Sequence, residues 1–176
     1  HQSLANFLIQ RAKSAICRSP DNPKAWSNLY TLCLQQDRRP DLVTFCQEII
    51  RQHPGQHQAW TFLQLACESA DQQTELTIFC KQVLHAHPDN TRAWSHIDRV
   101  FATNQSDIEA IEFCKEVIER HPGNQSAWTR LVSFYKKCGK YPDLINASIE
   151  VLKRNPNDPQ TLCNLADAYA AQQKYD

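Results

Sequence analysis

The sequence has few of the residues that make tight turns and no long apolar run. Its 176 residues include only three glycines and no methionine. So little glycine disfavours a hairpin-rich β fold, because the favoured hairpin turns need positive φ angles. No run approaches the roughly 18 apolar residues that cross a bilayer. Residues 1–17 do not resemble a signal peptide, since Arg11 and Lys13 interrupt their apolar pattern.

The chain also lacks an excess of charge of either sign. Lys and Arg together number 19, as do Asp and Glu, so the formal net charge is zero. This balance argues against wholesale binding to nucleic acid or to a membrane surface. The sequence contains no nucleophile elbow, glycine-rich phosphate loop, HExxH or EF-hand pattern. We therefore expect a chain that is not an enzyme and that holds neither a cofactor nor a metal.

What the sequence does contain is a period of 34 residues. Tryptophans recur at this interval, each directly after an alanine, and prolines keep the same interval. The tryptophans are Trp26, Trp60, Trp94 and Trp128, and the prolines are Pro20, Pro54, Pro88, Pro122 and Pro156. A fixed period of this length is the signature of a repeat architecture.

Each period contains two amphipathic helical stripes. The first runs from Trp26 to Cys33 and the second from Leu42 to Ile50, both with apolar residues at helical spacing. A proline ends each second stripe because its ring cannot continue the helical hydrogen bonds. We expect first helices at 22–36, 56–70, 90–104, 124–138 and 158–172. We expect second helices at 40–53, 74–87, 107–121 and 142–155, preceded by a helix at 2–18.

This pattern resembles the tetratricopeptide repeat (TPR) family, whose unit has aromatic, leucine and small residues on its first helix and a closing proline. The resemblance covers essentially the whole chain. It implies an all-α, right-handed superhelical solenoid of antiparallel helix pairs with a 34-residue period. In that fold the first helices line a concave groove, which commonly holds a peptide or a partner's helix.

We interpret residues 1–176 as a single array. Residues 1–21 fit the second helix of a truncated repeat, and 158–176 fit the first helix of another. The complete repeats are 22–55, 56–89, 90–123 and 124–157. Because a helix pair must stack on a neighbour to bury its apolar face, the truncated ends predict missing flanking repeats or end-to-end association of copies.

Three cysteines, Cys46, Cys80 and Cys114, share one repeat position. Equivalent positions on stacked helices lie at least about 8–10 Å apart, which is too far for a disulfide. We expect them to be small apolar core residues, and their unpaired thiols favour a reducing, cytoplasmic compartment. His53, His87 and His121 form a similar series before the prolines, where we expect exposed side chains or caps on helix carbonyls.

The resemblance to the TPR family implies which first-helix residues face the groove. The candidate partner-binding residues are Lys24, Asn28, Thr31, Phe62, Leu65, Arg92, His96, Arg99, Arg130, Ser133 and Asn164. One interpretation is a partner segment that places an apolar side chain near Phe62 and Leu65 and acidic groups near the arginines. The other is a solvated face whose charges pair with Asp98 or Asp167, with Phe62 extending the core. Asp98 replaces the family's small residue, and we expect it to be paired or partly solvated because an unpaired buried carboxylate is costly.

The leading functional hypothesis is a protein–protein interaction scaffold that binds a peptide or helical segment of a partner in the concave groove, and an acidic segment is one candidate ligand. The rival is an assembly module that self-associates through repeat ends or the convex face. A third reading is the targeting arm of a larger enzyme or an RNA-binding repeat, although the zero net charge disfavours nucleic acid.

Overall fold

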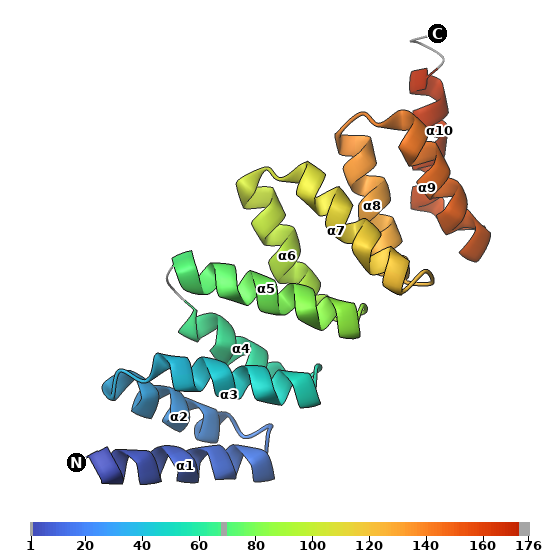
Figure 1. The fold of residues 1–176 in the computed structure, drawn as a ribbon. Helices are drawn as coiled ribbons and strands as arrows, with labels where there is room; N and C mark the ends of the chain where they lie inside the picture. The colour runs from blue at the N-terminus through green and yellow to red at the C-terminus, as the bar shows by residue number, and fades with distance from the viewer. Residues whose placement is uncertain (1, 68–69, 173–176) are drawn as a thin grey trace. The chain divides into compact units, whose positions relative to one another are not determined.

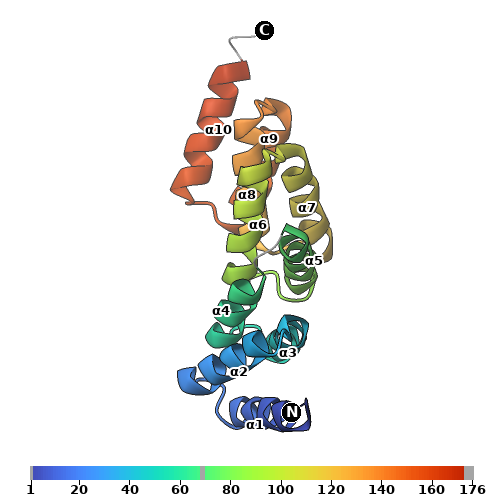
Figure 2. The ribbon, with the colours of Figure 1, turned by 90° about the vertical axis from the view of Figure 1, so that its left-hand side faces the viewer.

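The computed structural model describes residues 2–67 and 70–172, and these residues form ten α-helices in antiparallel pairs (Figures 1 and 2). The fold is an all-α, TPR-like helical repeat, as the period predicts. The helices are α1 (Gln2–Arg18), α2 (Pro23–Gln35), α3 (Arg39–Gln52), α4 (His57–Ala66), α5 (Ala70–Ala86), α6 (Thr91–Asn104), α7 (Asp107–Arg120), α8 (Gln125–Lys137), α9 (Tyr141–Arg154) and α10 (Pro159–Gln172).

The chain divides into two compact units, His1–Val83 and Leu84–Asp176, with the boundary inside α5. The first unit holds α1 to α4 and most of α5. The second holds the end of α5 and α6 to α10. No helix in the described part of the chain is long and apolar enough to span a membrane.

Among the described helices, those of the second repeat have boundaries that differ from expectation by more than one residue. Its first helix ends at Ala66, four residues early, and its second helix begins at Ala70, also four residues early. In the first and fourth repeats a proline in the first turn fixes the start of the second helix. Thr74 stands at that proline's position in the second repeat. Without the proline, α5 extends backwards through Asp71, Gln72 and Gln73.

The first helices begin at side chains that cap their free backbone N–H groups. A side-chain oxygen at the cap accepts a hydrogen bond from a backbone N–H two or three residues later, at 2.8–3.1 Å. The capping residues are Asn22, Gln56, Asn90, Asn124 and Asp158. An amide or carboxylate at this point of every repeat therefore sets where each first helix starts.

One contact explains why tryptophan and proline share a period. The indole N–H of each tryptophan donates a hydrogen bond to the backbone oxygen of the proline six residues earlier, at 2.7–2.9 Å. The pairs are Trp26–Pro20, Trp60–Pro54, Trp94–Pro88 and Trp128–Pro122. The ring fills the core while its polar edge satisfies a carbonyl of the inter-repeat turn, as a buried indole requires.

The cysteine series is confirmed as part of the core. Cys46, Cys80 and Cys114 are fully buried, and none of them forms a disulfide. Burial raises the pKa of the Cys114 thiol to about 12, because a thiolate would be poorly solvated there. These groups are therefore packing residues, since a reactive cysteine needs access and a lowered pKa.

Candidate functional site

A groove lies between α1 and α2 in the first unit, with a volume of about 600 Å³. Three of the predicted partner-binding residues, Lys24, Asn28 and Thr31, line one side of it, and all three are exposed. Arg11 of α1 lines the other side. We call this cavity the α1–α2 groove.

The floor of the α1–α2 groove is made of alanine and leucine side chains. Leu8, Ala12 and Ala15 of α1 face Ala25 and Leu32 of α2 across it. The small alanine side chains leave room between the two helices, while the long polar side chains stand at the rim. An apolar floor with a few polar groups is the usual composition of a binding pocket.

The rim of the groove carries two positive charges. Within the described residues, the guanidinium of Arg11 and the ammonium of Lys24 form no ion pair with a carboxylate. Arg11 stands where the next three second helices have Phe45, Phe79 and Phe113. The groove therefore has a cation at the position that the other repeats use for an aromatic core contact.

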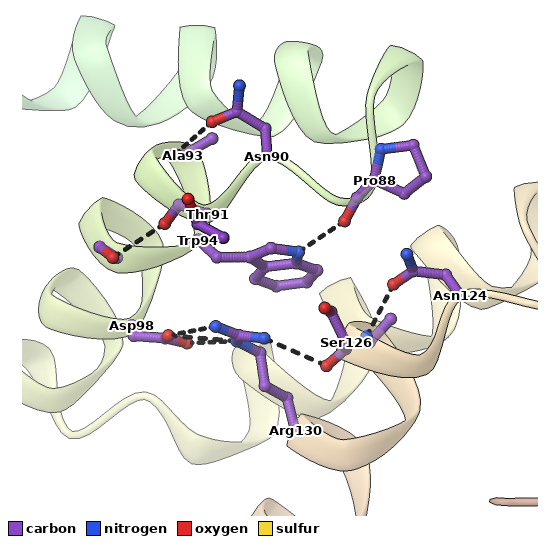
Figure 3. A network of polar contacts seen from close by, with 11 residues as sticks. Pro88, Asn90, Thr91, Ala93, Trp94, Asp98, Asn124, Ser126 and Arg130 are labelled. Atoms are coloured by element: carbon purple, nitrogen blue, oxygen red, sulfur yellow. Dashed lines mark hydrogen bonds and ion pairs between the residues drawn. The ribbon is translucent and has the colours of Figure 1, made fainter. Parts of the chain in front are cut away.

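In the second unit, the corresponding first-helix face neutralises much of its own charge. Arg130 of α8 holds Asp98 of α6 in a forked ion pair, with Nη2 2.8 Å from Oδ2 and Nε 2.9 Å from Oδ1 (Figure 3). The same guanidinium lies 4.4 Å from the ring centroid of Trp94 and donates from Nη1 to the Ser126 carbonyl. Asp98 is thus paired and partly solvated, as expected, and Arg130 is occupied within the fold.

Lysine and histidine side chains on this face are also engaged. Lys136 contacts Asp167 at 2.9 Å and the Asn164 side-chain oxygen at 3.0 Å. His96 is 2% exposed, and its Nδ1 lies 3.0 Å from Nη2 of Arg99. Burial, aided by the Arg99 charge, lowers the pKa of His96 to about 4. His96 is therefore neutral at pH 7 and adds no positive charge to this face.

The expected exposure of Phe62, His96 and Asn164 is not observed, and this corrects the helix phase assumed for the groove. Their exposed fractions are only 8%, 2% and 6%. All three occupy the repeat position two residues after the tryptophan position, and that position points toward the preceding repeat. Phe62 stacks on Trp26 with the ring planes 9° apart and the centroids 5.7 Å apart, so it extends the core.

The other predicted residues are distributed over both units. Leu65 is exposed in the first unit but stands without Phe62 beside it on the surface. In the second unit, Arg99 and Ser133 are exposed and Arg92 is half-buried. Ser133 and Arg130 line a shallow cavity of about 440 Å³ next to Asp98. The arginines that sequence reasoning grouped therefore do not form one unpaired basic surface.

Sequence reasoning missed Arg11 as a candidate site residue. The period could have identified it, since aligning α1 with the other second helices places an arginine in a phenylalanine series. For the series His53, His87 and His121, the sequence predicted exposed side chains or caps on helix carbonyls. The ring Nε2 of His121 lies 2.7 Å from the carbonyl oxygen of His85, near the end of α5. No group of three or more possible metal ligands is found among the described residues.

Comparison with known proteins gives the fold but not one family for the whole chain. A family model described as the protein prenyltransferase alpha subunit repeat matches residues 107–134, which hold α7 and most of α8. Among proteins with curated descriptions, none matches the sequence significantly.

Solved structures resemble this chain at low sequence identity. A chain of protein geranylgeranyltransferase-I from Candida albicans, in complex with GGPP, is 19% identical with a TM-score of 0.65; the match covers 94% of this chain and 60% of that one. A thermophilic TPR protein of Thermus thermophilus is 14% identical over 92% of this chain and 89% of its own, with a TM-score of 0.47. YrrB, described as a TPR protein with an unusual peptide-binding site, is 12% identical over 92% and 84%, with a TM-score of 0.49. At these identities the likeness concerns the fold.

Proposed function

We propose that this chain is a protein-interaction module that binds an acidic segment of a partner protein in the α1–α2 groove. The observation that carries the proposal is the groove itself, a cavity of about 600 Å³ with an apolar floor. Arg11 and Lys24 stand on its two sides. We propose that the chain is a member of the TPR family. Lys24, Asn28 and Thr31 then belong to the first-helix face that binds partners in that family.

An acidic occupant is favoured because the two rim cations have no carboxylate partner among the described residues. A partner carboxylate between them would form charge-assisted hydrogen bonds, which are stronger than neutral ones. Arg11 can bind both oxygens of one carboxylate through its planar fork, while Lys24 acts as a point charge. Apolar side chains of the same segment would cover Leu8, Ala12 and Ala25.

The first-helix face of the second unit supports this choice by contrast. Its cations Arg130 and Lys136 already pair with Asp98 and Asp167. An acidic ligand would have to break those contacts before it gained new ones. The α1–α2 groove carries no such cost, so it is the better site for an acidic segment.

Fluorescence anisotropy tests the proposal. The probe is a labelled helical peptide of about four turns, with leucines along one face and glutamates beside them. We expect it to bind the chain, and its glutamine counterpart to bind at least about tenfold more weakly, because the charge-assisted hydrogen bonds are lost. The double variant Arg11→Glu/Lys24→Glu should also weaken binding at least about tenfold because it places like charges in contact. Raising the salt concentration should weaken the wild-type complex.

A matched control makes the same change of charge elsewhere. The double variant Arg120→Glu/Lys140→Glu alters exposed cations of the second unit and should bind the acidic peptide as the wild type does. Equal loss of binding in both double variants would show that only net charge matters. That result, or unchanged binding by Arg11→Glu/Lys24→Glu, would contradict a site in the groove.

The comparisons support a second candidate function, that of a repeat segment from an alpha-subunit-like protein. The prenyltransferase alpha subunit repeat matches residues 107–134, and the geranylgeranyltransferase-I fold covers 94% of the chain. The chain spans about 60% of the matched transferase chain. In this function too, the chain contributes a binding surface and not catalytic groups. Co-expression with another subunit of a protein prenyltransferase tests it, and a stable complex on size-exclusion chromatography is the supporting result.

The rival assembly function makes a separate prediction. If repeat ends or the convex face drive self-association, light scattering should show a mass that rises with concentration. We propose instead a chain that stays monomeric across the series. We also propose a reducing, cytoplasmic setting, which is supported by buried cysteines that form no disulfide.

A further inference from the structure

The fourth repeat lacks an aromatic side chain that three preceding second helices share. Phe45, Phe79 and Phe113 occupy one repeat position, and Ala147 of α9 occupies the same position in the fourth repeat. In the earlier repeats this phenylalanine packs against the tryptophan of its own first helix. The ring centroids are 5.8 Å apart for Trp26–Phe45, 6.1 Å for Trp60–Phe79 and 5.7 Å for Trp94–Phe113.

The missing ring leaves a cavity. Trp26, Trp60 and Trp94 are at most 1% exposed, whereas Trp128 is only half-buried. A cavity of about 290 Å³ lies beside Trp128, with Leu131 and Ala147 also in its apolar wall. We call it the Ala147 cavity. It lies among α7, α8 and α9, and it shares no residue with the α1–α2 groove.

Carboxylates surround the opening of the Ala147 cavity. Glu119 of α7 and Asp143 and Glu150 of α9 line it, together with a single cation, Lys115. Glu150 bonds to Lys153, but Glu119 and Asp143 form no ion pair among the described residues. Glu119 and Asp143 are therefore two carboxylates of the cavity wall without an ion-pair partner among the described residues.

A tyrosine hydroxyl in the same cavity also lacks a partner. Tyr135 is 5% exposed and lines the cavity, yet its hydroxyl forms no hydrogen bond within the described part of the chain. The hydroxyl is not among the buried polar atoms that lack a partner, so it is open to solvent at the cavity. A ligand with hydrogen-bond donors would supply one.

The aromatic wall already contacts cations inside this unit. The guanidinium of Arg154 lies 4.9 Å from the Trp128 ring centroid, and the ammonium of Lys115 lies 5.9 Å from that of Tyr135. The rings of this wall therefore already form cation–π contacts within the unit.

We propose that the Ala147 cavity binds a basic side chain, arginine above lysine, from a partner protein. The alkyl stem takes the space of the missing phenylalanine ring against Trp128 and Leu131, as long basic side chains do on apolar surfaces. The guanidinium reaches Glu119 and Asp143, and its fork can also donate to the Tyr135 hydroxyl. The chain then has a second binding site with the opposite charge preference to the α1–α2 groove, and neither site requires the other.

A nitrogen-15 NMR titration tests this site, because the four tryptophans give separate indole N–H signals. The probe is a capped Gly-Arg-Gly peptide, and the control is its citrulline counterpart, which has the same shape without the charge. We expect the arginine peptide to shift the Trp128 signal in a saturable way and to leave the Trp26 signal unchanged. The citrulline peptide should bind at least about fivefold more weakly, because it lacks the charge that the carboxylates recognise.

A variant that fills the cavity gives the decisive test. Ala147→Phe restores the aromatic pattern of the other repeats, so we expect it to raise the melting temperature and to abolish the Trp128 shift. Ala147→Leu serves the same purpose if the larger ring is not accommodated. Glu119→Gln/Asp143→Asn should weaken binding at least about fivefold with the fold intact, whereas Glu112→Gln, an exposed neighbour on α7, should not. An unchanged shift in the filled variants, or equal binding of the citrulline peptide, would overturn the proposal.

Discussion

The guanidinium of Arg130 lies 4.4 Å from the ring centroid of Trp94, one repeat earlier. Phe62 holds the equivalent place against Trp26, at 5.7 Å. Two chemically different side chains thus cover a tryptophan in the same way, one through an aromatic stack and one through a cation–π contact. Phe62 and Arg130 each stand two positions after the tryptophan of their own repeat. Both side chains are therefore part of the packing between repeats.

This contact predicts that Arg130 and Asp98 are coupled in stability. Arg130→Ala should lower the free energy of unfolding by about 1–2 kcal/mol, because it removes a forked ion pair and the cover of Trp94. Asp98 is 42% exposed, so solvent screening limits the pair itself to about 1 kcal/mol. Urea unfolding of both single variants and the double variant measures this coupling. A coupling energy near zero would show that the two side chains act independently.

Substitution of Ser148 should increase the stability of the fold. It stands where the earlier second helices have Cys46, Cys80 and Cys114, and its hydroxyl is buried without a hydrogen-bond partner. Replacing it with cysteine or alanine should raise the free energy of unfolding by about 1 kcal/mol, since the unmade hydrogen bond is removed. The reverse change, Cys114→Ser, is the matched control and should lose about 1–2 kcal/mol, because it buries a hydroxyl in an apolar site. Destabilisation by both changes would contradict the packing described for this position.

The tryptophans should differ in how much each contributes to stability. Trp94→Ala removes a fully buried ring that packs on Phe113 and should cost about 3–5 kcal/mol. Trp128 is half-buried beside Ala147, so Trp128→Ala should cost less, about 1–3 kcal/mol. Thermal or urea unfolding compares the two variants directly. Equal losses would mean that the Ala147 cavity does not weaken packing around Trp128.

Because His96 is buried, the fold should lose stability in mild acid. Its pKa in the folded chain is lowered to about 4, whereas a histidine in the unfolded chain has a pKa of about 6.5. Between these values the unfolded chain binds more protons, so stability rises with pH and is lost as the pH falls from about 6.5 towards 4. We expect a loss of about 2 kcal/mol between about pH 7.5 and about pH 5.

Urea unfolding at the two pH values measures this loss, and His96→Gln provides the comparison. The variant should lose clearly less stability between the higher and the lower pH than the wild type. Part of the dependence should remain, because burial also lowers the pKa of His85. An identical pH dependence in the two proteins would show that His96 does not titrate as described.

The helices were largely predictable from the sequence because local chemistry fixes their ends. Amide caps such as Asn90 start the first helices, and prolines such as Pro88 end the second helices and accept the indole hydrogen bonds. The early start of α5 was not predicted, because the expectation carried over the proline-set start from other repeats. Thr74 imposes no such start.

The candidate site was only partly predictable. Lys24, Asn28 and Thr31 line a cavity, whereas Phe62 and His96, which the family resemblance also placed in the groove, turn into the core. Helical spacing gives the face of a helix to within a fraction of a turn. It does not reveal whether a residue at the edge of that face covers a neighbour's tryptophan. The sequence pattern also does not predict which side chains form ion pairs between repeats.

The central claim is that an acidic partner segment binds in the α1–α2 groove. The most direct measurement maps the glutamate-bearing peptide on the chain by nitrogen-15 NMR, with the side-chain amide of Asn28 as the reporter. We predict saturable shifts at Asn28 and at the backbone amides of Arg11 and Lys24, with the indole signal of Trp128 unchanged. Shifts confined to the second unit, or none at Asn28 when the peptide is bound, would contradict the account.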